Sequence, residues 1–161
     1  MIPKHIAFTS SFPVEVIFAA GHIPVDLNNV FITNDSSAKV QNAELKGFPR
    51  TFCSWIKGNY IAALSTNPDL IIGIVEGDCS NSNSLLDIFT EDHFPVYRFS
   101  FPADKNYEDL DKEITRLEDY FGVSRKETLQ AKQRLDKIRR KLIILDEWTW
   151  KERLVSGLEN H

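Results

Sequence analysis

The sequence predicts an α/β protein with a Rossmann-like (flavodoxin-like) parallel sheet, flanking helices and a C-terminal helical hairpin. Apolar strand-like runs alternate with helical segments over the first two thirds of the chain. One of these runs, Leu70–Val75, is apolar throughout, which is typical of a central parallel strand covered on both faces. Such alternation requires right-handed crossovers and a parallel sheet. We therefore expect residues 1–102 to form an α/β lobe and residues 103–161 a helical hairpin packed on it, within one domain.

The first strand and helix are marked by their boundary residues. A short apolar strand, Ile6–Thr9, is followed by Pro13, which is well placed for the first turn of a helix because its missing N–H costs nothing there. The helix is predicted over Val14–Ala20, and Gly21 suits a left-handed C-terminal cap.

The remaining elements follow from similar signals. Expected in order are a strand at Ile23–Leu27, an extended piece at Val30–Thr33, an irregular segment at 34–48, a helix at Phe52–Leu64, and a strand at Pro95–Phe99. Apolar residues at helical spacing from Tyr107 predict a helix that ends at Gly122. Ser124 then begins a longer helix, whose apolar stripe is Leu135, Ile138, Leu142 and Leu145.

Composition excludes several classes of protein. The 161 residues are 42% hydrophobic, with a formal net charge of −4 and no apolar run approaching the ~18 residues of a membrane span. We expect no nucleic-acid partner, no membrane segment and a cytoplasmic location. One basic island, residues 125–141, carries a net charge of +6, which leaves −10 on the rest of the chain. It suits either a solvated helix face or a site for an anionic ligand.

The two cysteines are the main candidates for chemistry. Cys79 falls where the predicted central strand gives way to a helix, and Cys53 falls at the start of another helix. Ligand sites of open α/β sheets lie outside the carboxyl ends of the strands, and helix N-termini stabilise a thiolate. Two thiolates there are suited to a soft metal or an iron–sulfur cluster. The alternative is a pair of free thiols that act only as small apolar residues.

Four segments in order carry a resemblance to a known family: Thr9–Glu15 (TSSFPVE), Ala19–Val25 (AAGHIPV), Cys53–Gly58 (CSWIKG) and Glu76–Asn81 (EGDCSN). Together they resemble the D-component of the 2-hydroxyacyl-CoA dehydratases, a family that also includes benzoyl-CoA reductase subunits. The resemblance covers most of the chain.

The resemblance implies a cofactor and partners. Family subunits have two Rossmann-like lobes around a [4Fe–4S] or related cluster, with two cysteine ligands from the first lobe and a third from the second. Cys53 and Cys79 match the first two, and the chain holds no third cysteine. The resemblance therefore implies a first lobe, from a fragment or a half-length relative, whose further cysteine comes from a second lobe or subunit. It also implies an acyl-CoA thioester substrate dehydrated through a ketyl radical, and an ATP-dependent activator that donates the electron.

Further residues have both a functional and a structural interpretation. Ser10, Ser11 and Glu15 are placed to contact substrate or cluster, with Glu15 as a group that moves a proton, but Ser11 also suits a helix cap and Glu15 the helix dipole. Arg50 suits either an anionic cluster or CoA phosphate, or an ordinary surface position. Trp55 is expected to pack in the core rather than to shield a cluster.

Two rival functions remain open at this stage. One is a reductase-like or double-cubane cluster protein of the same family, which moves low-potential electrons to another substrate. The other is a non-catalytic scaffold or assembly subunit that keeps the lobe but binds no cluster.

Overall fold

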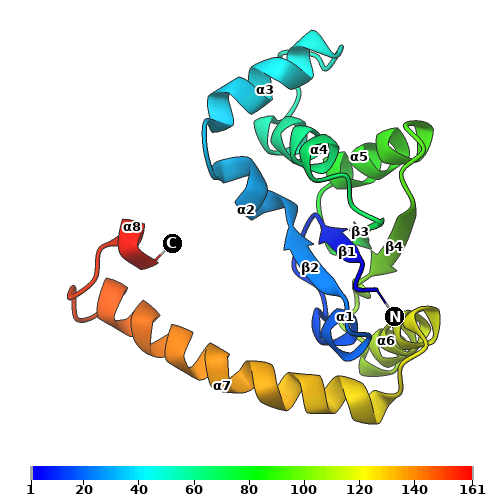
Figure 1. The fold of residues 1–161 in the computed structure, drawn as a ribbon, viewed down its shortest axis with the longest axis vertical. Helices are drawn as coiled ribbons and strands as arrows, with labels where there is room; N and C mark the ends of the chain where they lie inside the picture. Colours follow the sequence, from blue (N-terminus) through cyan, green and yellow to red (C-terminus); the bar gives the residue numbers. More distant parts are fainter. Residues whose placement is uncertain (1, 161) are drawn as a thin grey trace.

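The computed structural model describes residues 2–160, without the side chain of Leu158, and contains a four-stranded, all-parallel sheet (Figure 1). The strands are β1 (His5–Phe8), β2 (Ile23–Asp26), β3 (Leu70–Glu76) and β4 (Val96–Ser100), in the order β2-β1-β3-β4. In the ladders of the sheet, Ile6 of β1 is paired with Pro24 of β2 and with Leu70 of β3. Proline lacks an N–H, so its place on the edge strand β2 removes no bond from a central ladder. The predicted fold class is confirmed.

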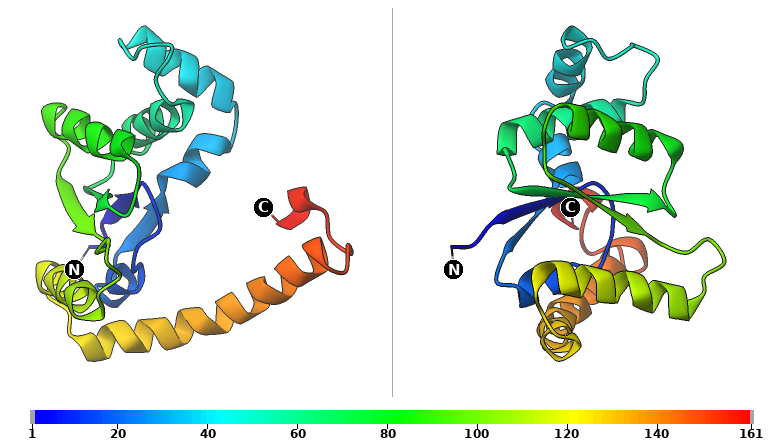
Figure 2. Two further views of the ribbon diagram at one scale, coloured as in Figure 1. Left: turned by 180° about the vertical axis from the view of Figure 1, so that it is seen from behind. Right: turned by 90° about the vertical axis from the view of Figure 1, so that its right-hand side faces the viewer.

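Helices cover both faces of the sheet, as the edge-on view of Figure 2 shows. On one face lie α2 (Leu27–Ile32), α4 (Ser54–Thr66) and α5 (Ser80–Glu91), and on the other lie α1 (Glu15–Ala19) and α6 (Tyr107–Phe121). Each layer has its own apolar core, because alternate strand residues point to opposite faces. Ala7 and Ile71 face the first core, and Ile6 and Ile72 face the second.

Two stretches predicted to be non-helical are helices. The extended piece predicted at Val30–Thr33 belongs to α2, and the irregular segment predicted at 34–48 contains α3 (Ser36–Leu45). Both helices begin at an aspartate whose carboxylate caps the first turn: Asp26 accepts from the N–H of Asn28, and Asp35 from that of Ala38. Helix α3 is polar and buries only Ala43, so it lacks the apolar periodicity that marks a helix in a sequence.

The last third of the chain forms α6, α7 (Arg125–Trp150) and a short α8 (Gly157–Asn160). As the sequence predicts, Gly122 ends α6, in the left-handed conformation, and α7 begins after Ser124. Ser124 and Glu127 form a capping box there. The first half of α7 packs on α1, whereas its second half leaves the body of the molecule (Figure 1). Residue 161, within the predicted C-terminal hairpin, and residue 1 lie outside the described residues.

Among the described residues, no helix combines the length and the apolar character that crossing a bilayer requires.

Gly58 in α4 allows the side chain of Phe31 to pack closely against this helix. A Cβ built on Gly58 would lie 2.0 Å from Cδ2 of Phe31, whose ring is 6% exposed. We expect Gly58→Ala to lower the free energy of unfolding by about 2 kcal/mol, because overpacking exceeds the ~1 kcal/mol gain in helix propensity. Urea denaturation measures the change. Adding Phe31→Leu should make the loss less than additive; strict additivity would contradict the clash.

Tyr60 predicts a pH effect on stability. Its hydroxyl donates to Asp92 Oδ2 at 2.7 Å, and burial and this hydrogen bond raise the pKa of the phenol to about 12. The raised pKa stabilises the fold below the unfolded pKa of ~10, and this contribution is lost as the pH rises toward 12. We expect Tyr60→Phe to cost about 1 kcal/mol at neutral pH and to lose less stability between pH 10 and 12 than the parent protein. Parallel pH profiles of the two proteins in urea denaturation would contradict the assignment.

Candidate functional site

A polar pocket lies at the carboxyl ends of β1 and β3. The sheet order reverses between these strands, since β1 is followed outward by β2 and β3 by β4. Such a switch point leaves a crevice where ligands bind in open α/β sheets. The cavity has a volume of about 290 Å³ and is lined by Thr9, Ser10, Ser11, Asn28, Cys53, Trp55, Ile56, Asn59, Asp78, Cys79 and Ser82.

Both cysteines line this pocket, each at the N-cap of a helix. Cys79 is the N-cap of α5 and Cys53 is the N-cap of α4, helices of 12 and 13 residues. Neither side chain caps its helix, and both residues are exposed free cysteines. The sulfurs therefore lie where two positive helix ends converge, and they remain available to a bound group.

The loop that presents Cys79 is fixed by its backbone. Gly77 has a φ of +93°, a left-handed conformation in which a Cβ would also meet Phe101 at 2.8 Å. Asp78 Oδ1 accepts from the N–H of Cys79 at 2.7 Å, a side-chain-to-backbone bond that orders the loop. The Cys79 Sγ then lies 3.6 Å from the Ser82 hydroxyl, one turn into α5.

The segment that leads to Cys53 is held by a buried lysine. The side chain of Lys57 is 1% exposed, and its Nζ lies 2.8 Å from Glu44 Oε1 and 3.0 Å from the carbonyl oxygen of Arg50. The ammonium thus ties the end of α3 and the loop before Cys53 to the first turns of α4. A buried charge is tolerated only when it is paired and hydrogen-bonded in this way. The sequence does not mark Lys57 as a site residue, because a lysine inside a helix gives no signal of burial.

Asn28 is the hydrogen-bonding centre of the pocket wall. Its amide nitrogen donates to Asp26 Oδ1 at 3.0 Å and to the Thr9 carbonyl at 3.1 Å. Its carbonyl oxygen accepts from Trp55 Nε1 at 2.5 Å and from Asn59 Nδ2 at 2.9 Å. One side chain therefore joins the end of β1, the cap of α2 and the first turns of α4.

This network leaves an unpaired acceptor in the pocket wall. Because the amide of Asn28 must donate toward the Asp26 carboxylate, its oxygen faces Asn59, which must present its own amide nitrogen. Asn59 Oδ1 is then left buried and without a hydrogen-bond partner, and so is the Thr9 hydroxyl. Both residues line the pocket. Unpaired buried polar atoms are rare, so the wall of this pocket is unusual in holding two of them.

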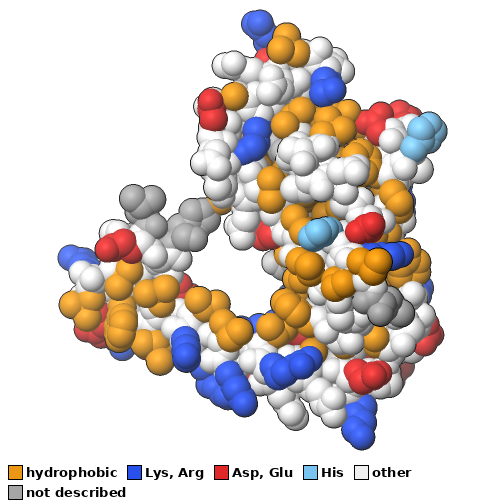
Figure 3. All heavy atoms as spheres, in the orientation of Figure 1, with side chains coloured by type: hydrophobic (Ala, Val, Ile, Leu, Met, Phe, Trp, Pro, Cys, Tyr) orange, Lys and Arg blue, Asp and Glu red, His pale blue; other side chains and the backbone are white. Residues whose placement is uncertain are grey.

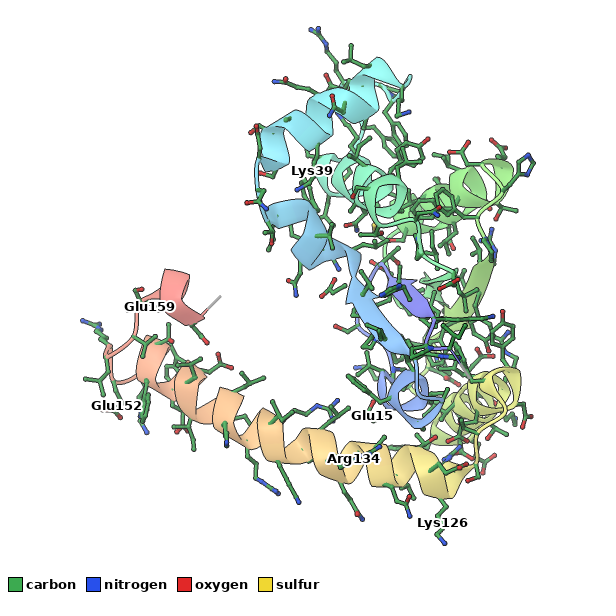
Figure 4. All side chains as sticks on the ribbon, viewed as in Figure 1. Glu15, Lys39, Lys126, Arg134, Glu152 and Glu159 are labelled. Carbon is green, nitrogen blue, oxygen red and sulfur yellow. The ribbon has the colours of Figure 1, made fainter. Side chains whose placement is uncertain are left out.

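The other predicted site residues divide into two sets. Ser10 and Ser11 line the pocket, but Ser11 does not cap α1, whose N-cap is Val14. Glu15 is not among the lining residues: its carboxylate pairs with Arg139 Nη1 at 2.7 Å, between α1 and α7 (Figure 4). Arg50 is not among them either, and its side chain is 93% exposed, with Glu44 3.9 Å away.

The prediction for Trp55 was wrong. The ring is 47% exposed at the pocket rather than packed in the core. It stands edge-on to the buried ring of Phe31, with centroids 5.2 Å apart, and its N–H bonds to Asn28. Helical spacing alone does not distinguish it from its buried neighbour Ile56.

The side chains present supply part of a cluster site. Two thiols at one pocket are soft ligands of the kind that iron–sulfur clusters take. Within residues 2–160, however, no group of three or more His, Cys, Asp and Glu side chains is arranged to hold a metal ion. Two thiols would hold one side of such a cluster only if its other ligands came from outside residues 2–160.

The structure is that of an α/β, Rossmann-like protein in which two cysteines line a pocket at the switch point of a parallel sheet. The chain matches the family described as 2-hydroxyglutaryl-CoA dehydratase, D-component, over residues 9–157. It belongs to this family, which confirms the resemblance. No curated protein matches the sequence.

The Asn28 network predicts a local stability effect. We expect Asn28→Ala to lower the free energy of unfolding by about 2 kcal/mol, because it leaves the Trp55 and Asn59 donors without their acceptor. The neighbouring Asn29 is exposed and provides a matched control, for which Asn29→Ala should change stability by less than ~0.5 kcal/mol. Equal effects of the two substitutions in urea denaturation would contradict the role of Asn28.

Proposed function

We propose that this chain is the lobe of a 2-hydroxyacyl-CoA dehydratase-type subunit that supplies two thiolate ligands, Cys53 and Cys79, to a [4Fe–4S] cluster. The observation that carries the proposal is the meeting of both cysteines at one pocket over the switch point of the sheet. They come from separate helices and lie 26 positions apart in sequence, so only the fold brings them to one pocket. Membership of the family supports the same interpretation.

The remaining ligands and the partners follow from the incomplete donor set. A further cysteine would come from a second lobe or subunit, since this chain holds only two. The substrate proposed is a 2-hydroxyacyl-CoA thioester, and the electron donor an ATP-dependent activator. When bound, the cluster would supply a low-potential electron and an open iron for the thioester.

The chain's own side chains would bind and orient groups in the pocket. The hydroxyls of Ser10 and Ser11 line the wall next to the end of β1, where they are placed to donate hydrogen bonds. The Asn28 network fixes the positions of the pocket-lining residues Thr9 and Asn59, so that this wall is rigid when a group binds. The exposed Trp55 ring covers one side of the pocket and would exclude water from it.

Anaerobic incubation with iron and sulfide tests the ligand assignment. We expect the chain, together with a candidate partner chain that supplies the missing cysteine, to acquire the broad visible absorption of an iron–sulfur cluster, and Cys53→Ala and Cys79→Ala each to lose most of the bound iron, because thiolates hold the cluster. Ser80→Ala is the matched control, since this exposed residue adjoins Cys79 in sequence. Circular dichroism checks that each variant is folded.

Two outcomes would contradict the proposal. Iron bound equally well by both cysteine variants would show that these thiols are not the ligands. A folded chain that takes up no iron, even with a candidate partner chain present, would instead favour the scaffold function.

A further inference from the structure

The two cysteines occupy equivalent positions in their helices. Cys53 is the N-cap of α4 and Cys79 is the N-cap of α5, and neither sulfur accepts a capping hydrogen bond from the backbone. The side chain three positions later, at N3, can reach back toward the N-cap residue. In α4 this residue is Ile56 and in α5 it is Ser82, and both are buried and line the pocket. The two sulfurs therefore share a helical setting but have N3 neighbours of opposite polarity.

The Ser82 hydroxyl has the Cys79 sulfur as its partner. Ser82 is 5% exposed, and its Oγ lies 3.6 Å from Cys79 Sγ, an ordinary length for a hydrogen bond to the large sulfur atom. Within residues 2–160, this is the only hydrogen bond that the structure gives the hydroxyl. The N–H of Cys79, which an N3 side chain reaches in a capping box, already donates to Asp78 Oδ1. Because a buried hydroxyl without a partner is costly, this one is held to the sulfur.

Cys53 lacks a neighbour of this kind. The side chain of Ile56, at N3 of α4, carries no hydrogen-bonding group. The indole N–H of Trp55, which also lines the pocket, is already donated to Asn28 Oδ1 at 2.5 Å. In the part of the chain that the structure describes, the Cys53 sulfur caps no N–H of its helix and stays a free thiol. The two thiols thus differ in hydrogen bonding although their backbone positions match.

We infer that Ser82 is a positioning residue that donates a hydrogen bond to the Cys79 thiolate and makes the two sulfur ligands unequal. A thiolate carries no hydrogen, so the sulfur accepts and the hydroxyl donates. The bond draws electron density from this sulfur and restrains the Cys79 side chain. Hydrogen bonds to ligand sulfurs tune the reduction potential of an iron–sulfur cluster, and they raise it because they stabilise the more negative, reduced form. The inference rests on the proposed function, since only a bound cluster has a potential to raise.

Ser82 also has a purely structural interpretation, as a small residue that fits the buried first turn of α5. In that case, removal of its hydroxyl would leave the properties of the sulfur unchanged. The far part of α7, where exposed apolar side chains gather within residues 138–154 (Figure 3), shares no residue with the cysteine pocket. Substitutions at Ser82 leave that surface unchanged, so their effects report on the pocket.

Infrared spectroscopy of the metal-free chain tests the contact through the S–H stretching band. The chain holds two cysteines, so Cys53→Ala leaves Cys79 as the only source of this band, and Cys79→Ala leaves Cys53. We expect Ser82→Ala to shift the Cys79 band and Ser82→Thr, which keeps the hydroxyl, to leave it in place. The Cys53 band should respond to neither. Ser84→Ala is the matched control, because the hydroxyl of this exposed α5 serine lies 3.4 Å from the carbonyl oxygen of Ser80.

Two infrared results would overturn the inference. One is a Cys79 band that Ser82→Ala leaves unmoved, and the other is an equal shift of the Cys53 band. The parent chain gives a check that needs no variant at Ser82, because unequal hydrogen bonding of the two thiols predicts two resolved S–H bands. A single coincident band would contradict the inference as well. Circular dichroism shows whether each variant is folded.

The reduction potential of the cluster tests the consequence. In the complex with a candidate partner chain, we expect Ser82→Ala to lower the ratio of reduced to oxidised cluster at a fixed solution potential by about threefold or more. Ser82→Thr and Ser84→Ala should match the parent. A cluster that forms with unchanged potential in Ser82→Ala would overturn the tuning by Ser82 and leave the ligand assignment intact. A parent complex that forms no cluster would overturn the proposed function and the tuning with it, while the infrared bands would still decide the contact.

Discussion

The parallel pairing of β1 with β3 is the constraint on which the site depends. Phe8 faces Ile72 in that ladder, so the loops that follow the two strands leave the sheet side by side. One loop brings Thr9, Ser10 and Ser11 to the pocket, and the other brings Asp78 and Cys79. Because the crossovers from these strands run to opposite faces of the sheet, the loops diverge and leave the crevice open. A shift in this register would move one half of the pocket relative to the other.

A second constraint on the site is the hydrogen-bond network centred on Asn28. Asn28 connects three elements whose order in the sequence gives no hint that they meet. The direction of each amide follows from the Asp26 carboxylate, which caps α2 and accepts from Asn28. The same aspartate that begins a helix thereby decides which atom of Asn59 is left without a hydrogen-bond partner. Helix capping and the chemistry of the pocket are thus physically linked.

Much of the fold was predictable from the sequence, because it rests on local signals. The run at Leu70–Val75, the glycines that end helices and the serine that begins α7 each act within a few residues, and the structure has them as predicted. Helices α2 and α3 were missed because their stabilisation is tertiary. The Lys39 ammonium lies among the carbonyl oxygens of Phe31, Thr33 and Asn34 at the end of α2, a contact that no periodicity reveals. At the site, both cysteines fall at the starts of predicted helices, so the sequence placed them at one edge of the sheet. The Asn28 network had no local signal, because it depends on three elements that meet only in the fold.

Glu15 holds α7 on the body of the molecule and takes no part in the pocket. Its sequence position beside the end of β1 suggested a proton-moving group, yet its carboxylate is bound by Arg139, and this ion pair fastens α7 to α1. A half-buried pair of this kind is costly to break, because either partner alone would leave a charge poorly solvated. Among the described residues that line the pocket, Asp78 is then the only charged side chain. Thiolates there would be balanced by the N-termini of α4 and α5 rather than by lysine or arginine. A site built in this way stabilises a modest negative charge. The proposed cluster, shared with ligands from another lobe or subunit, would place such a charge at this pocket.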